Sequence, residues 1–109
     1  MLSYVQLRQF ISAPGRLGVF FIMPKLKIYT KSYCPCCVRA IAALTSAGVT
    51  DYEEISIDGN EMTMRRELVT LTGGRWDVPQ VFVDDTYLGD DDDLVRLAGS
   101  GELAALLAP

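Results

Sequence analysis

The chain has 109 residues, of which half are hydrophobic and 22% are charged, and its formal net charge is −4. This balance indicates one small folded domain and excludes a disordered or low-complexity chain. All fourteen acidic residues lie in residues 51–109, whereas residues 1–50 carry six basic residues and no acidic one. Six dispersed cations are too few for a nucleic-acid surface, so we expect no nucleic-acid partner.

The first 22 residues differ from the rest of the chain. They contain two arginines, no acid and a Pro-Gly pair, and the apolar run 17–23 is far shorter than the ~20 residues that span a bilayer. We therefore expect no membrane segment. An arginine-containing, acid-free segment is typical of an organelle transit peptide, but it also fits an upstream start codon before Met23. We predict that residues 1–22 are a disordered N-terminal extension or a misassigned start, and that residues 23–109 are the domain.

The first half of this domain has the pattern of a strand, a helix and a second strand. Apolar and polar residues alternate over 25–30, as in a half-buried strand. Pro35 fits the first turn of a helix, and apolar residues at helical spacing continue from there to Gly48, which ends it. Residues 52–57 alternate again and predict the second strand.

The second half predicts a helix, a hairpin and a further helix. Asp58 and Glu61 have the spacing of a capping box, and the helix that would follow ends at the glycines of 73–74. A short strand, its hairpin partner, a third helix and a last apolar turn are expected at 80–83, 86–88, 90–98 and 103–107. The order β-α-β-α-β-β-α predicts an α/β fold with a central four-stranded mixed sheet flanked by helices.

All three cysteines, Cys34, Cys36 and Cys37, lie within four residues. A disulfide there would close a very small loop, so a structural staple is excluded. A structural zinc site generally needs four ligands, and the chain has no histidine. We expect no metal, although an iron–sulfur cluster shared by two chains is kept as an alternative. Adjacent thiols of this kind indicate a reducing compartment, and we expect a cytoplasmic location.

The remaining interpretation is a redox centre. Cys34 would stand at the start of a helix, where free N–H groups and the helix dipole favour a thiolate, and Lys31 and Arg39 would add positive charge. Cys37 follows at i+3, within reach of a disulfide, so that one thiol can attack while the other resolves. Cys-x-x-Cys beside a βαβ pattern indicates a thioredoxin-like redox motif. Cys36 should point outward, as a filler or as an extra thiol open to glutathionylation.

Three segments resemble the hallmarks of the glutaredoxin family. Residues 28–37, IYTKSYCPCC, resemble its active-site strand and loop, and residues 78–82, VPQVF, resemble its segment with a cis-proline. Residues 88–94, LGDDDDL, resemble the turn that opens its last long helix. The resemblance runs from about residue 25 to the C-terminus and implies the glutaredoxin form of the thioredoxin-like fold.

The resemblance implies a glutathione-dependent thiol–disulfide oxidoreductase that reduces protein disulfides and glutathione mixed disulfides. Cys34 would be the nucleophile and Cys37 the resolving thiol. Glutathione would be the co-substrate, disulfide-containing proteins would be the partners, and the protein would be a monomer. A redoxin of the same fold that is recycled by thioredoxin reductase is an alternative.

The resemblance also implies a glutathione groove. Lys31 and Tyr33 would flank it, Lys31 with Arg75 would hold the glycyl carboxylate, and the backbone of Val78, before Pro79, would pair with the tripeptide. The helix start at Asp91 and Asp92 would receive the γ-glutamyl end, its N–H groups taking the carboxylate and Asp92 the ammonium.

The sequence departs from the family pattern at three points of this groove, one of which is the run of four aspartates at 90–93, which suits a helix start but would repel a glutathione carboxylate. Asp90 replaces the second glycine of the turn, where a glycine permits positive φ, and Asp77 stands where the family usually has threonine. Both changes add negative charge, so we expect a lower affinity for glutathione than is usual in the family.

Overall fold

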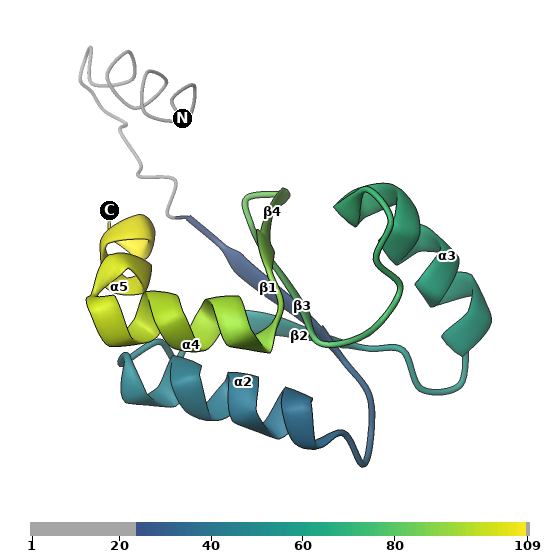
Figure 1. Ribbon diagram of the computed structural model, residues 1–109, viewed down its shortest axis with the longest axis horizontal. Coiled ribbons are helices and arrows are strands. Elements are labelled where there is room, and N and C mark those ends of the chain that lie inside the picture. Colours follow the sequence, from purple (N-terminus) through teal and green to yellow (C-terminus); the bar gives the residue numbers. More distant parts are fainter. Residues whose placement is uncertain (1–23, 109) are drawn as a thin grey trace, which may run out of the picture.

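The computed structural model describes residues 24–108. The predicted extension 1–22 and the proposed start at Met23 lie outside the described residues, so the division of the chain stays a prediction. Figure 1 shows a central sheet with helices on both of its faces.

The order of helices and strands follows the prediction, with one helix added at the end. The elements are β1 (Leu26–Thr30), α2 (Pro35–Ser46), β2 (Tyr52–Ser56), α3 (Glu61–Thr72), β3 (Gln80–Val83), β4 (Thr86–Gly89), α4 (Asp91–Ser100) and α5 (Glu102–Leu107). The last apolar stretch, predicted only as a turn, forms α5 after Gly101, whose φ of 85° ends α4.

The four strands form one mixed sheet in the order β2-β1-β3-β4. β1 pairs with β2 in parallel, and it pairs with β3 antiparallel; β3 and β4 form the expected hairpin. β2 is therefore an edge strand of this sheet, and its Glu53 and Glu54 are exposed. The predicted α/β fold with a four-stranded mixed sheet is confirmed.

Each face of the sheet has its own hydrophobic core. On one face, Leu26, Ile28 and Val81 pack under buried residues of α2, α4 and α5. On the other face, Tyr29, Phe82 and their neighbours pack against Leu68 of α3. Burial on both faces explains why three of the four residues of β3 are apolar and why β1 has Leu26 and Ile28 on one face and Tyr29 on the other. In Figure 1, α2, α4 and α5 lie together and α3 lies apart from them.

The predicted capping box at Asp58 is wrong. The residue before α3 is Asn60, which makes no side-chain capping hydrogen bond. The Asp58 carboxylate instead accepts hydrogen bonds from the backbone N–H of Ser32, at 3.1 Å, and from its hydroxyl, and so ties the cysteine loop to the end of β2. Within α3, Glu61 and Arg65 form an i,i+4 ion pair at 2.8 Å. No helix within residues 24–108 is long and apolar enough to cross a membrane.

Candidate active site

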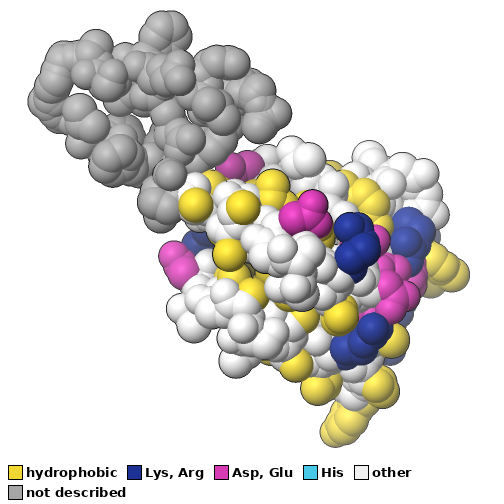
Figure 2. Space-filling model, turned by 60° about the vertical axis from the view of Figure 1, so that its left-hand side comes forward, with side chains coloured by type: hydrophobic (Ala, Val, Ile, Leu, Met, Phe, Trp, Pro, Cys, Tyr) yellow, Lys and Arg dark blue, Asp and Glu magenta, His cyan; other side chains and the backbone are white. Residues whose placement is uncertain are grey.

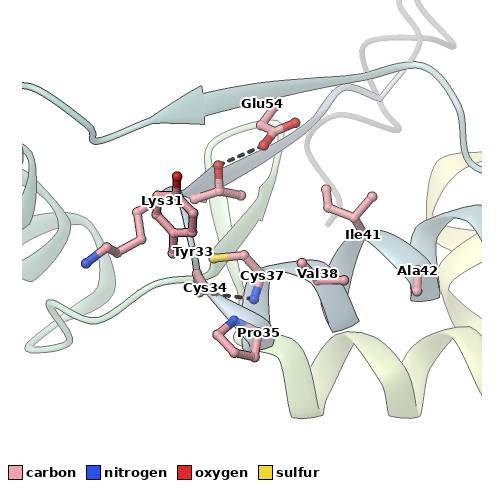
Figure 3. Close-up of a pocket in the computed structure, with 10 residues that line it drawn as sticks. Lys31, Tyr33, Cys34, Pro35, Cys37, Val38, Ile41, Ala42 and Glu54 are labelled. Atoms are coloured by element: carbon pink, nitrogen blue, oxygen red, sulfur yellow. Dashed lines mark hydrogen bonds between the residues drawn. The ribbon is translucent and has the colours of Figure 1, made fainter.

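The cysteine loop connects β1 to α2 and presents Cys34 at the helix start. Cys34 is the N-cap residue, with extended backbone angles, and Pro35 occupies the first turn. The Sγ atom of Cys34 accepts a hydrogen bond from the backbone N–H of Cys37 at 3.1 Å (Figure 3). The sulfur thus takes one of the N–H donors that a helix N-terminus leaves free. Tyr33 precedes it with a φ of 55° and a fully exposed side chain.

The three thiols differ in exposure, and none is in a disulfide. Cys37 is only 4% exposed. Burial, followed by its hydrogen bond with Cys34, raises the pKa of the Cys37 thiol to about 12, so it is a neutral thiol at physiological pH. Cys36 is exposed, and the nearby negative charge of Asp91 raises the pKa of its thiol. Cys34 is half-buried, so its exposure lies between those of the exposed Cys36 and the buried Cys37.

An open pocket of about 700 Å³ lies beside these cysteines. Figure 3 shows Val38, Ile41 and Ala42 continuing along α2 from the cysteines, with Glu54 on the other side. Thr30 donates a hydrogen bond to the Glu54 carboxylate at 2.8 Å. The pocket gives a disulfide room to approach Cys34 over a mostly apolar surface.

The loop before β3 contains the expected cis peptide bond between Val78 and Pro79. The buried Gln80 fixes this loop, because its amide donates to the backbone carbonyl of Asp77 at 2.9 Å. The Tyr87 hydroxyl donates in turn to the Gln80 side-chain oxygen at 2.7 Å. Position 80 is therefore a structural support for the Asp77–Pro79 loop.

Lys31 is part of a charge chain that runs along α3. Its ammonium lies 3.4 Å from the Glu61 carboxylate, which also binds Arg65. Arg65 in turn donates to the carbonyl of Trp76 at 2.7 Å and stacks over its ring. In Figure 3 the Lys31 side chain extends away from the cysteines. The positive charge that the sequence led us to expect next to Cys34 is thus paired with a carboxylate of α3.

Arg75 is held by two carboxylates. It makes two hydrogen bonds to Asp77, at 3.0 and 2.8 Å, and one to Asp90 at 3.1 Å. These bonds raise the pKa of the guanidinium, and Arg75 holds the pKa of the Asp77 carboxyl below its usual value. Burial alone would raise the pKa of Asp90, but the N–H of Asp93 and the Arg75 guanidinium outweigh burial and lower it.

Asp90 caps α4 with its own carboxylate. One oxygen accepts from the backbone N–H groups of Asp92, at 3.0 Å, and Asp93, at 3.2 Å. The Asp93 carboxylate accepts from the Asp90 N–H at 3.1 Å, which completes a capping box. Asp90 does not use the positive φ that a glycine permits, because it is extended with a φ of −103° and the positive φ, 142°, is at Gly89.

Arg39 links the cysteine helix to α4. Its guanidinium binds the carboxylates of Asp91, at 2.7 Å, and Asp92, at 2.6 Å. The prediction that Arg39 adds positive charge for Cys34 is therefore incomplete, since two carboxylates compensate that charge. Figure 2 shows basic and acidic side chains lying next to one another on the face that it draws.

These ion-pair partners were not predicted from the sequence. The resemblance to glutaredoxins implied that Lys31, Arg75, Asp91 and Asp92 bind glutathione, and each of the four is engaged by another side chain of the protein. The run of four aspartates could have indicated these ion pairs, because closely spaced carboxylates need compensating positive charge and the chain has few basic residues to supply it. Within residues 24–108, no group of three or more potential ligands is arranged to hold a metal ion.

Comparisons with known proteins agree with this architecture. The family model described as Glutaredoxin matches residues 26–88. Glutaredoxin 3 of Escherichia coli is 45% identical over 85 residues, which are 78% of this chain and 99% of that protein. A glutaredoxin of Pseudomonas aeruginosa is 42% identical over 86 residues, or 79% of this chain and 99% of the relative. The solution structure of a Brucella melitensis glutaredoxin superposes with a TM-score of 0.64 at 35% identity, covering 78% of this chain and 89% of that one.

Proposed function

This chain belongs to the glutaredoxin family and is a thiol–disulfide oxidoreductase, and we propose that it depends on glutathione, with Cys34 as the nucleophile and Cys37 as the resolving thiol. The observation that carries this proposal is the contrast between the two sulfurs. Cys34 lies at a helix start and accepts the Cys37 N–H, whereas Cys37 is buried with a pKa of about 12. Cys34 is therefore placed to attack a disulfide, and Cys37 is placed to resolve the mixed disulfide that this attack forms.

In the proposed reaction with a glutathione mixed disulfide, the Cys34 thiolate attacks the glutathione sulfur. The old S–S bond breaks, the substrate leaves as a thiolate that takes a proton from water, and Cys34 becomes bonded to glutathione. A second glutathione thiolate then attacks this bond. Its products are glutathione disulfide and the reduced Cys34 thiolate, so one free glutathione is oxidised for each mixed disulfide reduced, and the other half of the glutathione disulfide comes from the substrate.

With a protein disulfide, Cys34 would form a mixed disulfide with one substrate sulfur and release the other as a thiolate. The Cys37 sulfur then attacks Cys34 and gives its proton to the departing substrate thiol. The products are a substrate dithiol and a Cys34–Cys37 disulfide, which two glutathione molecules reduce. Because Cys37 must lose a proton held with a pKa of about 12, we expect this step to be slower than the attack by Cys34.

We propose that glutathione lies between the cysteine loop, the cis-proline loop and the start of α4. The residues expected to contact it are Lys31, Tyr33, Arg75, Val78, Pro79, Asp91 and Asp92. Val78 would supply backbone hydrogen bonds in the manner of an added strand. We further propose that the protein acts as a cytoplasmic monomer on disulfide-containing proteins.

The test is NADPH-coupled reduction of a glutathione mixed disulfide in the presence of glutathione and glutathione reductase. Cys34→Ser should abolish turnover, Cys37→Ser should retain it for the mixed disulfide and lose it for a protein disulfide, and Cys36→Ser serves as the matched thiol control. Turnover that survives in Cys34→Ser would contradict the assignment. Activity that appears only with thioredoxin reductase would replace glutathione as the reductant.

A further inference from the structure

We propose that Asp90 and Asp77 occupy the carboxylate sites of the glutathione groove, so that the protein prefers disulfides flanked by cationic groups, such as protein cystines next to lysine or arginine, over glutathione disulfide. The inference rests on the proposed function, because it concerns the same groove. It concerns which disulfides react fastest with Cys34, and it leaves glutathione as the reductant, since a reductant in excess need not bind tightly.

The first of these sites is the start of α4. A helix N-terminus binds a ligand carboxylate through its free N–H groups. Here the N–H groups of Asp92 and Asp93 already donate to the Asp90 carboxylate, at 3.0 and 3.2 Å. The Asp90 side chain is itself held by Arg75 at 3.1 Å. A γ-glutamyl carboxylate would have to displace an anion that belongs to the protein.

The second site is the Arg75 guanidinium. An arginine that faces a carboxylate with two parallel N–H groups is at its strongest as an anion binder. Arg75 already makes such a two-bond contact with Asp77 through Nε and an Nη atom, in addition to its bond to Asp90. A glycyl carboxylate would therefore have to compete with Asp77 and Asp90 for these N–H donors of Arg75.

The charge balance of the surrounding side chains favours a cation. Arg39 and Arg75 carry two positive charges, and the carboxylates that they bind carry four negative ones, those of Asp77, Asp90, Asp91 and Asp92. Lys31 and Arg65 share the single carboxylate of Glu61 and add a net charge of +1, so the balance stays negative, with four cations against five carboxylates. Each half of glutathione disulfide has two carboxylates and one ammonium, so it brings net negative charge to a surface with an excess of carboxylates.

A positively charged group next to the substrate disulfide would not have to compete with these aspartates for hydrogen-bond donors. Asp92 is largely exposed, with 77% of its side-chain surface accessible, and Asp77 is 54% accessible, so both can accept an additional ammonium or guanidinium. Asp91 also lies near the CPCC loop, since its charge acts on the Cys36 thiol. A positive group next to the disulfide would therefore approach carboxylates as its sulfur approaches Cys34.

The test compares three symmetric disulfides of different charge on the full chain with Cys36→Ser and Cys37→Ser, so that Cys34 is the only thiol. Cystamine ends in ammonium groups, hydroxyethyl disulfide is uncharged, and glutathione disulfide carries the carboxylates. In each reaction the Cys34 thiolate forms an S–S bond with one half and releases the other half as a thiolate. The rate constant is measured by quenching the reaction with acid at set times and following the mixed disulfide on Cys34 by intact mass. It is then divided by the rate constant of the same disulfide with a small uncharged thiol, which removes the intrinsic reactivity of the disulfide.

After this normalisation, cystamine should react about tenfold faster than glutathione disulfide, and the preference should shrink as salt is added. Asp90→Gly and Asp77→Thr should each move the ratio several-fold toward glutathione, whereas Asp51→Asn, which removes a carboxylate outside the groove, should leave it unchanged. Asp90→Asn keeps an oxygen for the α4 N–H groups while it removes the charge, so it tests the same shift should the glycine variant be unstable.

Two results would overturn the inference in different ways. A wild-type groove that reacts with glutathione disulfide as fast as with cystamine, or a ratio that Asp90→Gly and Asp90→Asn both leave unchanged, refutes the role of the aspartates and leaves the proposed function standing. A protein whose Cys34 reacts with none of the three disulfides refutes the proposed function, and the inference fails with it.

Discussion

Replacing Gly89 by alanine should lower the free energy of unfolding strongly. The φ of Gly89 is 142°, and a Cβ built on it would lie 2.6 Å from both Cβ and Cγ of Asp93, with an Asp93 carboxylate oxygen closer still. Asp93 cannot simply rotate away, because its carboxylate accepts the Asp90 N–H in the capping box of α4. Gly89→Ala therefore strains the backbone and breaks the cap together.

The two costs can be estimated separately. Holding a non-glycine residue at a sparsely populated φ costs ~1–3 kcal/mol. Loss of a helix cap costs ~0.5–2 kcal/mol. Together they lower the free energy of unfolding by about 1.5–5 kcal/mol, out of the ~5–15 kcal/mol of a typical domain. For a domain of this size, ~1 kcal/mol corresponds to ~4–8 °C, so the Tm should fall by at least about 6 °C.

The assay is thermal unfolding of the reduced full chain, followed by circular dichroism. Gly99→Ala is the matched control, because Gly99 lies in α4 and nothing is within 4 Å of its built Cβ. That substitution should leave the Tm unchanged or raise it, since alanine is favoured over glycine inside a helix by ~0.5–1 kcal/mol. Equal Tm values for the two variants, or a Gly89→Ala protein within a few degrees of the wild type, would refute the reasoning.

Three further outcomes are expected. Iodoacetamide at neutral pH should modify Cys34 well before Cys37, as followed by peptide mass mapping, and early labelling of Cys37 would contradict its burial. The raised pKa of Cys37 favours the folded state below its ordinary value of 9.0, and this contribution is lost as pH rises toward about 12, so urea titrations should show a fall in stability over that range that Cys37→Ala reduces. Arg39→Gln should lower the Tm because it leaves Asp91, only 8% exposed, without its cation, whereas Arg96→Gln at an exposed pair should change the Tm little.

The fold was largely predictable from local patterns. Alternation over 25–30 and the glycines at 73–74 mark element limits through backbone preferences that do not depend on distant residues. The capping box at Asp58 failed for the opposite reason. Its carboxylate had two possible donors, and the tertiary fold brought Ser32, 26 residues earlier in the chain, within reach. Local spacing shows that a cap is possible, but it does not show which donor is nearest.

In the candidate site, too, the features that depend on local sequence could be predicted, and those that depend on the tertiary fold could not. The placement of Cys34 and Cys37 follows from their i, i+3 spacing at a helix start, which the sequence contains. The pairing of Arg39 with Asp91 and of Arg75 with Asp90 does not, because these partners lie 52 and 15 residues apart in the chain and several carboxylates compete for each guanidinium. Only the approach of α2 to α4, and of the cis-proline loop to the turn at Asp90, decides the pairing.

The edge strand β2 bears on solubility. An edge strand leaves backbone N–H and C=O groups free to pair with another sheet, which is a route to aggregation. β2 has glutamates at two consecutive positions, Glu53 and Glu54, and consecutive strand residues point to opposite faces. A second copy that aligned its own β2 here would bring like charges together on both faces of the joined sheet. The protein can thus expose this edge and still resist joining its sheet to that of a neighbouring molecule.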